Sequence, residues 1–397
     1  MQRSAIATAL AAASLAATLF VAALFAALPA HAQEAFKFGN LSPLSGPAAA
    51  FGIGINRGIE LAAEDIGTFT VAGKQYKLEL TPYDTSLDPG KTVAALNRAV
   101  LNDNVRYGFI LGAAVHGAVL PIIRQTGFFD VFMGAAGKEI TNAENPTVFR
   151  FMASSDQLYY TFTPEIYKKL NIKRIAFMGP NNDLGRSDVR TLKDVATRLK
   201  GQGVEFVGEE LVEINAKDFQ AALLRLLAKN PDVIDTNASP TGTVGLIAKQ
   251  ARELGYKGYF VSSTAVLEAK ALVSIAGKGA DNIVAYRIWA SPPTKLYQEL
   301  AERHEKKYKE ATLGTVWEAY AATRWVVEAV VKAGTFDTKK VAEQLAGSTF
   351  QFHPYGPATW GGIKSHGAQR QIQTPLPASI IRDGKWEALE TRMGTLE

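Results

Sequence analysis

The sequence predicts an α/β protein made of two lobes, each built on a parallel, Rossmann-like sheet. Apolar strand patterns alternate with amphipathic helix patterns along most of the chain. These patterns form two successive series, which indicates two sheets and therefore two lobes. A content of 47% hydrophobic and 20% charged residues is ordinary for a globular protein with an ample core.

Residues 1–32 read as a signal peptide rather than as part of the fold. Arg3 supplies a positive start, residues 6–28 are almost unbroken apolar, and Ala30-His31-Ala32 is an A-x-A cleavage site. The apolar run is also long enough for a retained membrane anchor, but its alanine content and cleavage site favour removal. We therefore expect the mature chain to start at Gln33 and to be exported to the periplasm.

The first series of elements begins with a buried strand at 36–41, a turn and a helix start within 36–58. Asp88-Pro89 is a helix-start signal for 90–102. Pro121 indicates that the helix pattern at 116–126 begins near that proline. The further strands of this series are predicted at 77–82, 107–111 and 128–133.

The second series has the same alternation and is followed by helices. Its strands are predicted at 174–178, 204–208, 232–235, 259–262 and 282–286. Its helices are predicted at 187–202, after Lys217-Asp218-Phe219, and at 244–254. The joins between lobes are expected at 149–155 and 286–293, and the chain ends with helices at 294–309, 316–333 and 339–346 and a hairpin-like tail at 350–389.

Ligands of parallel sheets bind beyond the carboxyl ends of the strands, so the loops at those ends are the candidate site. They are residues 42–54, 83–89, 112–118 and 134–138 in the first series and 179–186, 236–243 and 262–266 in the second.

Enzymatic and nucleic-acid functions find little support. GxSxG, HExxH and GxxxxGK[ST] motifs are absent, there is no cysteine, and the five histidines lack metal-ligand spacing. The formal charge is +5, or +4 without Arg3, which is too small for a nucleic-acid footprint. Gly52, Gly54 and Gly58 form GxGxxxG rather than the dinucleotide fingerprint, which favours close packing. No catalysis, metal or cofactor is expected.

Single side chains leave two interpretations open. His116 either donates to a ligand carboxylate or caps the helix that follows it. Asp156 either binds an ammonium group or caps a helix. Phe51 either lines an apolar pocket or packs in the core.

The chain resembles the leucine/isoleucine/valine-type periplasmic binding proteins, the receptors of branched-chain amino acid ABC transporters. The resemblance extends from residue 36 to about residue 390 and rests on the order of many short matches. They are Leu44-Ser45-Gly46-Pro47 with Phe51-Gly52, Tyr83-Asp84, Asp88-Pro89, Gly112, Phe149-Arg150, Asp156-Gln157, Leu184-Gly185, 217–219, Pro231-Asp232, 317–322 with Tyr320, and Asp383-Gly384-Lys385.

The resemblance implies two lobes joined by a three-strand hinge, with residues 33–153 and 288–370 in lobe 1 and 154–287 and 371–397 in lobe 2. It implies that a small ligand is trapped between the lobes and that the closed form contacts permease subunits of an inner-membrane complex. An exported ligand sensor or an amide-binding regulator with the same module is the alternative.

The resemblance also assigns site residues. The loop that binds the ligand carboxylate maps to Ala114, Val115 and His116, and the next loop maps to Ala135, Ala136 and Gly137. Phe51 keeps an aromatic position, and Asp156, Leu184, Ser239 and Thr264 complete the set. Backbone donors for a carboxylate survive, but the usual partners of an ammonium group are depleted. The family favours an aliphatic amino acid, whereas these residues favour an apolar or aromatic carboxylate.

Overall fold

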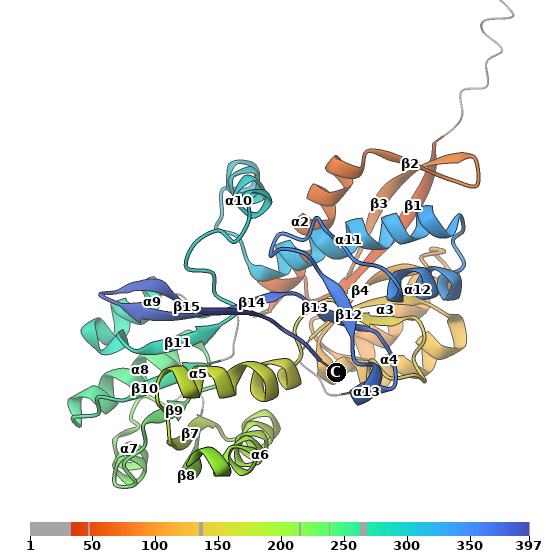
Figure 1. Ribbon diagram of the computed structural model, residues 1–397. Helices are drawn as coiled ribbons and strands as arrows, with labels where there is room; N and C mark the ends of the chain where they lie inside the picture. The colour runs from red at the N-terminus through yellow and green to blue at the C-terminus, as the bar shows by residue number, and fades with distance from the viewer. Residues whose placement is uncertain are drawn as a thin grey trace, which may run out of the picture.

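The computed structural model describes residues 33–396, except for 47, 135–137, 214–215, 238, 263–266 and 268. It shows two lobes, each with a central sheet and helices on both faces (Figure 1). The predicted signal peptide at 1–32 lies outside the described residues. Among the residues that are described, none of the helices is long and apolar enough to cross a membrane.

Lobe 1 has an eight-stranded sheet in the order β12-β13-β6-β5-β4-β1-β3-β2. Its centre is parallel and both edge strands are antiparallel. The strands are β1 (Glu34–Ser42), β2 (Thr68–Val71), β3 (Lys74–Asp84), β4 (Tyr107–Leu111), β5 (Phe129–Met133), β6 (Val148–Arg150), β12 (Thr359–Gly361) and β13 (Gln371–Gln373).

The helices of lobe 1 cover the two faces of this sheet. They are α2 (Ala49–Ile66), α3 (Pro89–Leu101), α4 (Ala113–Thr126), α10 (Lys295–Tyr308), α11 (Gly314–Ala333), α12 (Thr338–Ala346) and α13 (Ile363–His366). Helices α2, α11 and α12 share one hydrophobic core with Phe38 and Phe109, whereas α3 and α4 share another with Leu41 and Ile110. Alternate side chains of each strand therefore fill opposite layers.

Lobe 2 has a seven-stranded sheet in the order β15-β14-β11-β10-β9-β7-β8. The strands are β7 (Arg174–Pro180), β8 (Glu205–Val212), β9 (Val233–Asp235), β10 (Tyr259–Ser262), β11 (Ile283–Tyr286), β14 (Pro375–Arg382) and β15 (Lys385–Met393). The helices are η1 (Gln157–Phe162, a π-helix), α5 (Thr163–Lys169), α6 (Asp183–Arg198), α7 (Gln220–Leu227), α8 (Thr241–Glu253) and α9 (Ala269–Ala276), with short 3-10 turns η2 (Lys200–Gln202) and η3 (Gly277–Ala280).

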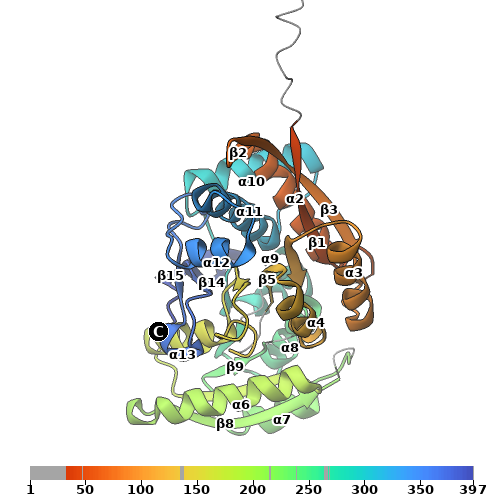
Figure 2. The same cartoon turned by 90° about the vertical axis from the view of Figure 1, so that its right-hand side faces the viewer.

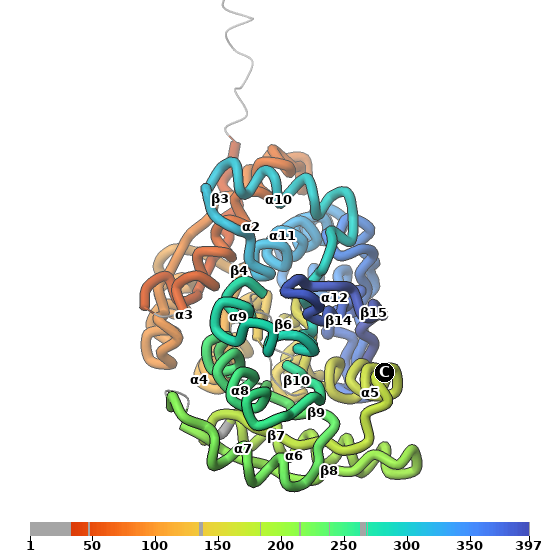
Figure 3. Tube along the Cα trace, turned by 90° about the vertical axis from the view of Figure 1, so that its left-hand side faces the viewer, coloured from red at the N-terminus to blue at the C-terminus, as the bar shows by residue number. Residues whose placement is uncertain are grey.

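The two faces of the second sheet are also covered. Helices α5 and α6 pack on one face, around Phe177, and α7, α8 and α9 pack on the other, around Ile234. Figures 2 and 3 view the stacked lobes from opposite sides, with α6 nearer in Figure 2 and α8 and α9 nearer in Figure 3.

Three crossovers connect the sheets: after β6, after β11, and between β13 and β14. The buried amide of Gln157 connects the first and third of these crossovers to the segment after β15. Its Nε2 donates to the carbonyls of Ile372 (2.8 Å) and Gly394 (2.6 Å), and its Oε1 accepts from the backbone N–H of Ser154 (2.8 Å). One side chain thus joins the first crossover, the third crossover and the segment after β15.

Close approach of α2 and α11 explains the GxGxxxG spacing. A Cβ at Gly58 would stand 2.7 Å from the Cβ of Ala319 and 2.9 Å from the backbone nitrogen of Tyr320. A Cβ at Gly54 would collide with Thr315. Gly54 and Gly58 therefore serve close packing, as predicted, and the packing is between the two helices α2 and α11.

Two expectations need correction here. Neither sheet is wholly parallel, because β2 and β12 pair antiparallel with their neighbours in lobe 1, and β14 pairs antiparallel with β11 and β15 in lobe 2. Helix α4 begins at Ala113 rather than near Pro121. Val115, Val119 and Ile123 are buried in the core, and this packing offsets the hydrogen bond that the proline lacks.

The predicted hairpin tail is divided between the lobes. Residues 371–373 form β13, which pairs with β6 in lobe 1, so the change of lobe falls after residue 373 rather than after 370. The segment after β15 returns toward lobe 1, since the carbonyl of Leu396 accepts from the backbone of Gly362 (3.1 Å) and from Gln373 Nε2 (2.9 Å).

Candidate ligand-binding cavity

A cavity of about 260 Å³ lies at the carboxyl ends of β4 and β5, beside the first turns of α2 and α11. This is where ligands bind in open parallel sheets. Phe51, Leu87, Gly112 and Gly134 bring to it the four loops that the sequence singled out in the first series. Most of its wall is apolar, from Phe51, Leu87, Leu111, Met133, Met152 and Leu313.

Three helices point their N-termini toward this cavity. Phe51 lies in the first turn of α2, Gly112 and Ala113 start α4, and Leu313, Gly314 and Thr315 start α11. None of the three has a side-chain cap or an acidic residue in its first turn. Other helices of the same lobe are capped by side chains: α3 by Asp88, α10 by Thr294 and α12 by Asp337. Uncapped N–H groups and helix dipoles favour an anion in the cavity.

Arg287 adds a full positive charge. It follows β11 at the start of the second crossover, with φ at +63°, and its N–H donates to the carbonyl of Pro377 (2.8 Å). Its side chain reaches the cavity and is 12% exposed. The left-handed backbone is uncommon for arginine and aims the side chain out of lobe 2 toward lobe 1.

Glu318, in the second turn of α11, is the partner of Arg287. Arg287 Nη2 donates to Glu318 Oε1, and the glutamate side chain is only 3% exposed. Burial raises the pKa of Glu318 above its ordinary value, and Arg287 opposes this effect. Glu318 Oε2 and Thr315 Oγ1 are buried and have no hydrogen-bond partner among the described residues. Both residues line the cavity.

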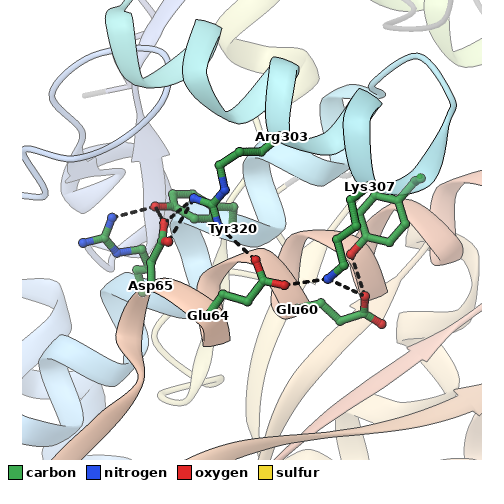
Figure 4. A network of polar contacts seen from close by, with 8 residues as sticks. Glu60, Glu64, Asp65, Arg303, Lys307 and Tyr320 are labelled. Carbon is green, nitrogen blue, oxygen red and sulfur yellow. Dashed lines mark hydrogen bonds and ion pairs between the residues drawn. The ribbon is translucent and has the colours of Figure 1, made fainter.

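Larger depressions elsewhere have a different character. One of about 660 Å³ lies against α10 and α11, and its charged groups satisfy one another (Figure 4). There, Arg303 donates to Asp65 Oδ1 (2.9 Å), Tyr320 donates to Asp65 Oδ2 (2.6 Å), and Arg303 and Lys307 divide the two oxygens of Glu64. This network has the bonding pattern of a structural contact between helices.

Phe51 lies on the cavity wall, as one of its two interpretations predicted. Ala114 is exposed one residue beyond the cavity-lining Ala113, and Val115 is buried in the core. His116 is also fully buried: Nδ1 contacts the Gly112 carbonyl at 2.7 Å and Nε2 contacts Asp130 Oδ2 at 2.9 Å. The structure therefore corrects the prediction that its ring faces the ligand. Both ring nitrogens are engaged within lobe 1, and His116 holds the start of α4.

The other predicted residues do not reach this cavity. Asp156 is half-buried at the start of η1, Leu184 is 54% exposed in the first turn of α6, and Ser239 is buried before α8. Leu184 and Ser239 lie at the carboxyl ends of β7 and β9, on the corresponding edge of the second sheet. Ala135, Ala136, Gly137 and Thr264 lie outside the described residues.

Sequence reasoning missed Arg287, Thr315 and Glu318. One signal was available for Glu318, because an acid between Trp317 and Ala319 in an apolar helix is out of place unless it is paired. Arg287 carried no comparable signal, since nothing in its neighbourhood distinguishes it from other arginines that follow a strand.

Two α/β lobes linked by three crossovers, with an anion-favouring cavity at the strand ends beside one crossover, define the class of two-lobed solute-binding proteins. The chain belongs to the periplasmic binding protein family, whose family model matches residues 35–375. Members of this family are periplasmic receptors for small molecules that work with ABC transporters, and they are not enzymes.

Three relatives illustrate the likeness. The Leu/Ile/Val-binding protein of Escherichia coli (strain K12) is 24% identical over 330 residues, which cover 82% of this chain and 87% of that protein. A leucine binding protein from Thermotoga maritima MSB8 has a TM-score of 0.72 at 22% identity, over 89% of this chain and 98% of that one. An ABC transporter solute binding protein from R. palustris, in complex with benzoate, has a TM-score of 0.71 at 20% identity, over 91% and 96%.

Proposed function

We propose that this protein is the receptor of an ABC importer and that it binds a small carboxylate with an apolar body. One observation carries this proposal: three uncapped helix N-termini and Arg287, which is paired with Glu318, surround a cavity whose remaining wall is mostly apolar. Such a cavity attracts one anionic group and excludes water from the rest of the ligand. The relatives named for leucine, isoleucine and valine, and the one in complex with benzoate, support a ligand of this kind.

In this proposal the start of α4 binds the carboxylate through the backbone of Gly112 to Ala114, and Ala135, Ala136 and Gly137 extend the donor set. Phe51 packs against the apolar body of the ligand. The lobe 2 residues Asp156, Leu184, Ser239 and Thr264 approach the ligand when the lobes close. The ligand bridges both lobes only in the closed form, so it shifts the equilibrium toward the form that the permease binds.

Thermal shift and titration calorimetry of the purified protein test the ligand class. The probes are leucine, isoleucine, valine, benzoate and 4-methylpentanoate, with leucinamide and benzamide as matched compounds without the carboxylate. A carboxylate at 100 times its Kd should stabilise the fold by about 2.7 kcal/mol. Amides that bind as tightly as the acids would contradict the recognition of a carboxylate group. If none of the acids binds, the proposal is overturned.

The contact with Phe51 is tested by Phe51→Ala, with Phe352→Ala as the control because Phe352 is 59% exposed. We expect the affinity for the bound acid to fall roughly tenfold or more in the first variant and to stay unchanged in the second. Uptake of the same acid by cells that lack the gene tests transport. Unchanged uptake would contradict the importer role and favour an exported sensor.

A further inference from the structure

The first two turns of α11 present two buried polar atoms that no other described residue satisfies. Glu318 Oε2 and Thr315 Oγ1 have no hydrogen-bond partner among the described residues, although Glu318 is 97% and Thr315 93% buried as residues. Buried side-chain oxygens are normally hydrogen-bonded, and a buried carboxylate oxygen without a donor is costly. Both residues line the cavity, so a hydrogen-bond donor on a bound ligand can reach them from the cavity.

A purely structural ion pair looks different in the same lobe. In the contact between α2 and α10, each oxygen of Asp65 and of Glu64 accepts a hydrogen bond from Arg303, Lys307 or Tyr320 (Figure 4). Glu318 is far more buried than these two acids, yet only one of its oxygens is engaged. Asp130 Oδ1 in lobe 1 is also buried without a hydrogen-bond partner among the described residues, but Asp130 does not line the cavity, whereas Glu318 does.

Arg287 fixes where the ligand's charge must lie. Its Nη2 donates to Glu318 Oε1, its guanidinium has further N–H donors, and the residue lines the cavity. A ligand carboxylate that pairs with Arg287 therefore sits beside Glu318. A donor on the ligand, close to that carboxylate, would reach Glu318 Oε2.

Resting on the proposed function, we propose that Glu318 determines specificity by accepting a hydrogen bond from an ammonium or hydroxyl group carried next to the ligand's carboxylate. Arg287 pairs with the carboxylate, and Thr315 Oγ1 offers a second acceptor or donor one turn away. The preferred ligands are then 2-amino or 2-hydroxy acids with an apolar body. The family resemblance assigned the partners of an ammonium group to other positions, where the usual residues are depleted. In this proposal Glu318 supplies an acceptor for that group from lobe 1.

Two matched sets of acids test this inference by calorimetry on the unmodified protein. One set is L-leucine, 2-hydroxy-4-methylpentanoate and 4-methylpentanoate, and the other is phenylglycine, mandelate and phenylacetate. Within a set, the donor-bearing acids should bind at least roughly tenfold more tightly than the acid without a donor. The acid that binds more tightly, the 2-amino acid or the 2-hydroxy acid, identifies the preferred donor group.

Glu318→Gln should remove most of the preference for the donor-bearing acids. Glu328→Gln is the matched control, because it is the same change in the same helix at a side chain that is 38% exposed. Thr315→Val supplies a second variant if Glu318→Gln does not fold, and it should reduce the preference in the same direction.

Equal binding of all three acids of the set that binds, or a preference that survives in Glu318→Gln, would overturn this inference and leave the proposed function standing. If no acid of either set binds, this inference fails, and the proposed function fails with it only if isoleucine, valine and benzoate do not bind either.

Discussion

Asp188, in helix α6, is a carboxyl group held away from water. Its Oδ2 accepts from Asn237 Nδ2 at 3.1 Å, and the residue is only 5% exposed. Burial raises the pKa of Asp188 to about 7, against the opposing hydrogen bonds from Asn237 and Tyr159. The unfolded chain, where the ordinary value is 3.8, holds this proton less tightly. The contribution of Asp188 to stability is therefore complete below about pH 4 and is lost as the pH rises to about 7.

We accordingly predict that the free energy of unfolding falls between pH 4 and pH 8 more in the wild type than in Asp188→Asn. The difference between the two curves should reach roughly 4 kcal/mol at most, from about three pKa units. Urea denaturation at a series of pH values measures it. Asp194→Asn, in the same helix but with a side chain that is 46% exposed, is the control and should follow the wild type. Parallel curves for Asp188→Asn and the wild type would contradict the prediction.

Single side chains were the hardest feature to predict from the sequence. The position of His116 after a strand was correct, but its direction was not, because a one-residue shift along a helix turns a side chain by about 100°. Phe51 was predicted on the strength of its aromatic side chain at a strand–helix loop, which is a local property. Arg287 and Glu318 meet only in the folded chain, 31 residues apart, so no local pattern identified them as a pair.

At the scale of elements, the contact between α2 and α11 supports the cavity from behind. Thr315 and Glu318 sit at the start of α11, and the glycines of α2 let the two helices approach closely. Gly54 faces Thr315 directly, so the spacing of the helices also places a wall of the cavity.

Gly58→Ala should lower the free energy of unfolding by about 1–3 kcal/mol, because the added methyl meets Ala319 and the backbone of Tyr320. Gly117→Ala in α4 is the matched control, since a Cβ there meets nothing within 4 Å and the residue is exposed. We expect the control to be neutral or more stable by roughly 0.5–1 kcal/mol. Chemical denaturation of both variants decides, and equal stability of the two would show that the helices have room to separate.

Most strands and helices were predictable because their patterns are local. The run at β4 was predicted at its observed bounds, and Asp88 caps α3 as its motif indicated. The exceptions needed information from elsewhere in the fold. Strand β2 is a short edge strand whose pairing with β3 decides its structure, and Pro121 stays inside α4 because the helix is anchored on both sides of it.

At the scale of the whole molecule, the three crossovers form the hinge, and the hydrogen bonds of Gln157 connect chain segments across it. The amide joins the first crossover at Ser154, the third at Ile372 and the returning segment at Gly394. Residues 371–373 join the sheet of lobe 1 through a pairing of β13 with β6, and no periodicity of the sequence predicts that pairing.

Gln157→Ala should lower the free energy of unfolding by roughly 2–4 kcal/mol, because it leaves buried carbonyls and an N–H unsatisfied and opens a small cavity. Hydrogen exchange should rise first at residues 371–374 and 394–396. Gln298→Ala, at an exposed glutamine of α10, should stay within about 0.5 kcal/mol of the wild type. If the two variants were equally stable, the hydrogen bonds of Gln157 would contribute nothing to the stability of the contacts between the crossovers.

The hydrogen bonds around Gln157 join amide groups, which neither gain nor lose protons, and salt does not screen these uncharged contacts. The contacts that Gln157 makes between the first and third crossovers should therefore stay unchanged when the pH or the salt concentration around the cell changes. The ion pair of Arg287 with Glu318 is made of charged groups and does not share this independence. The first and third crossovers are thus held by uncharged contacts, whereas the second carries a charged residue of the cavity.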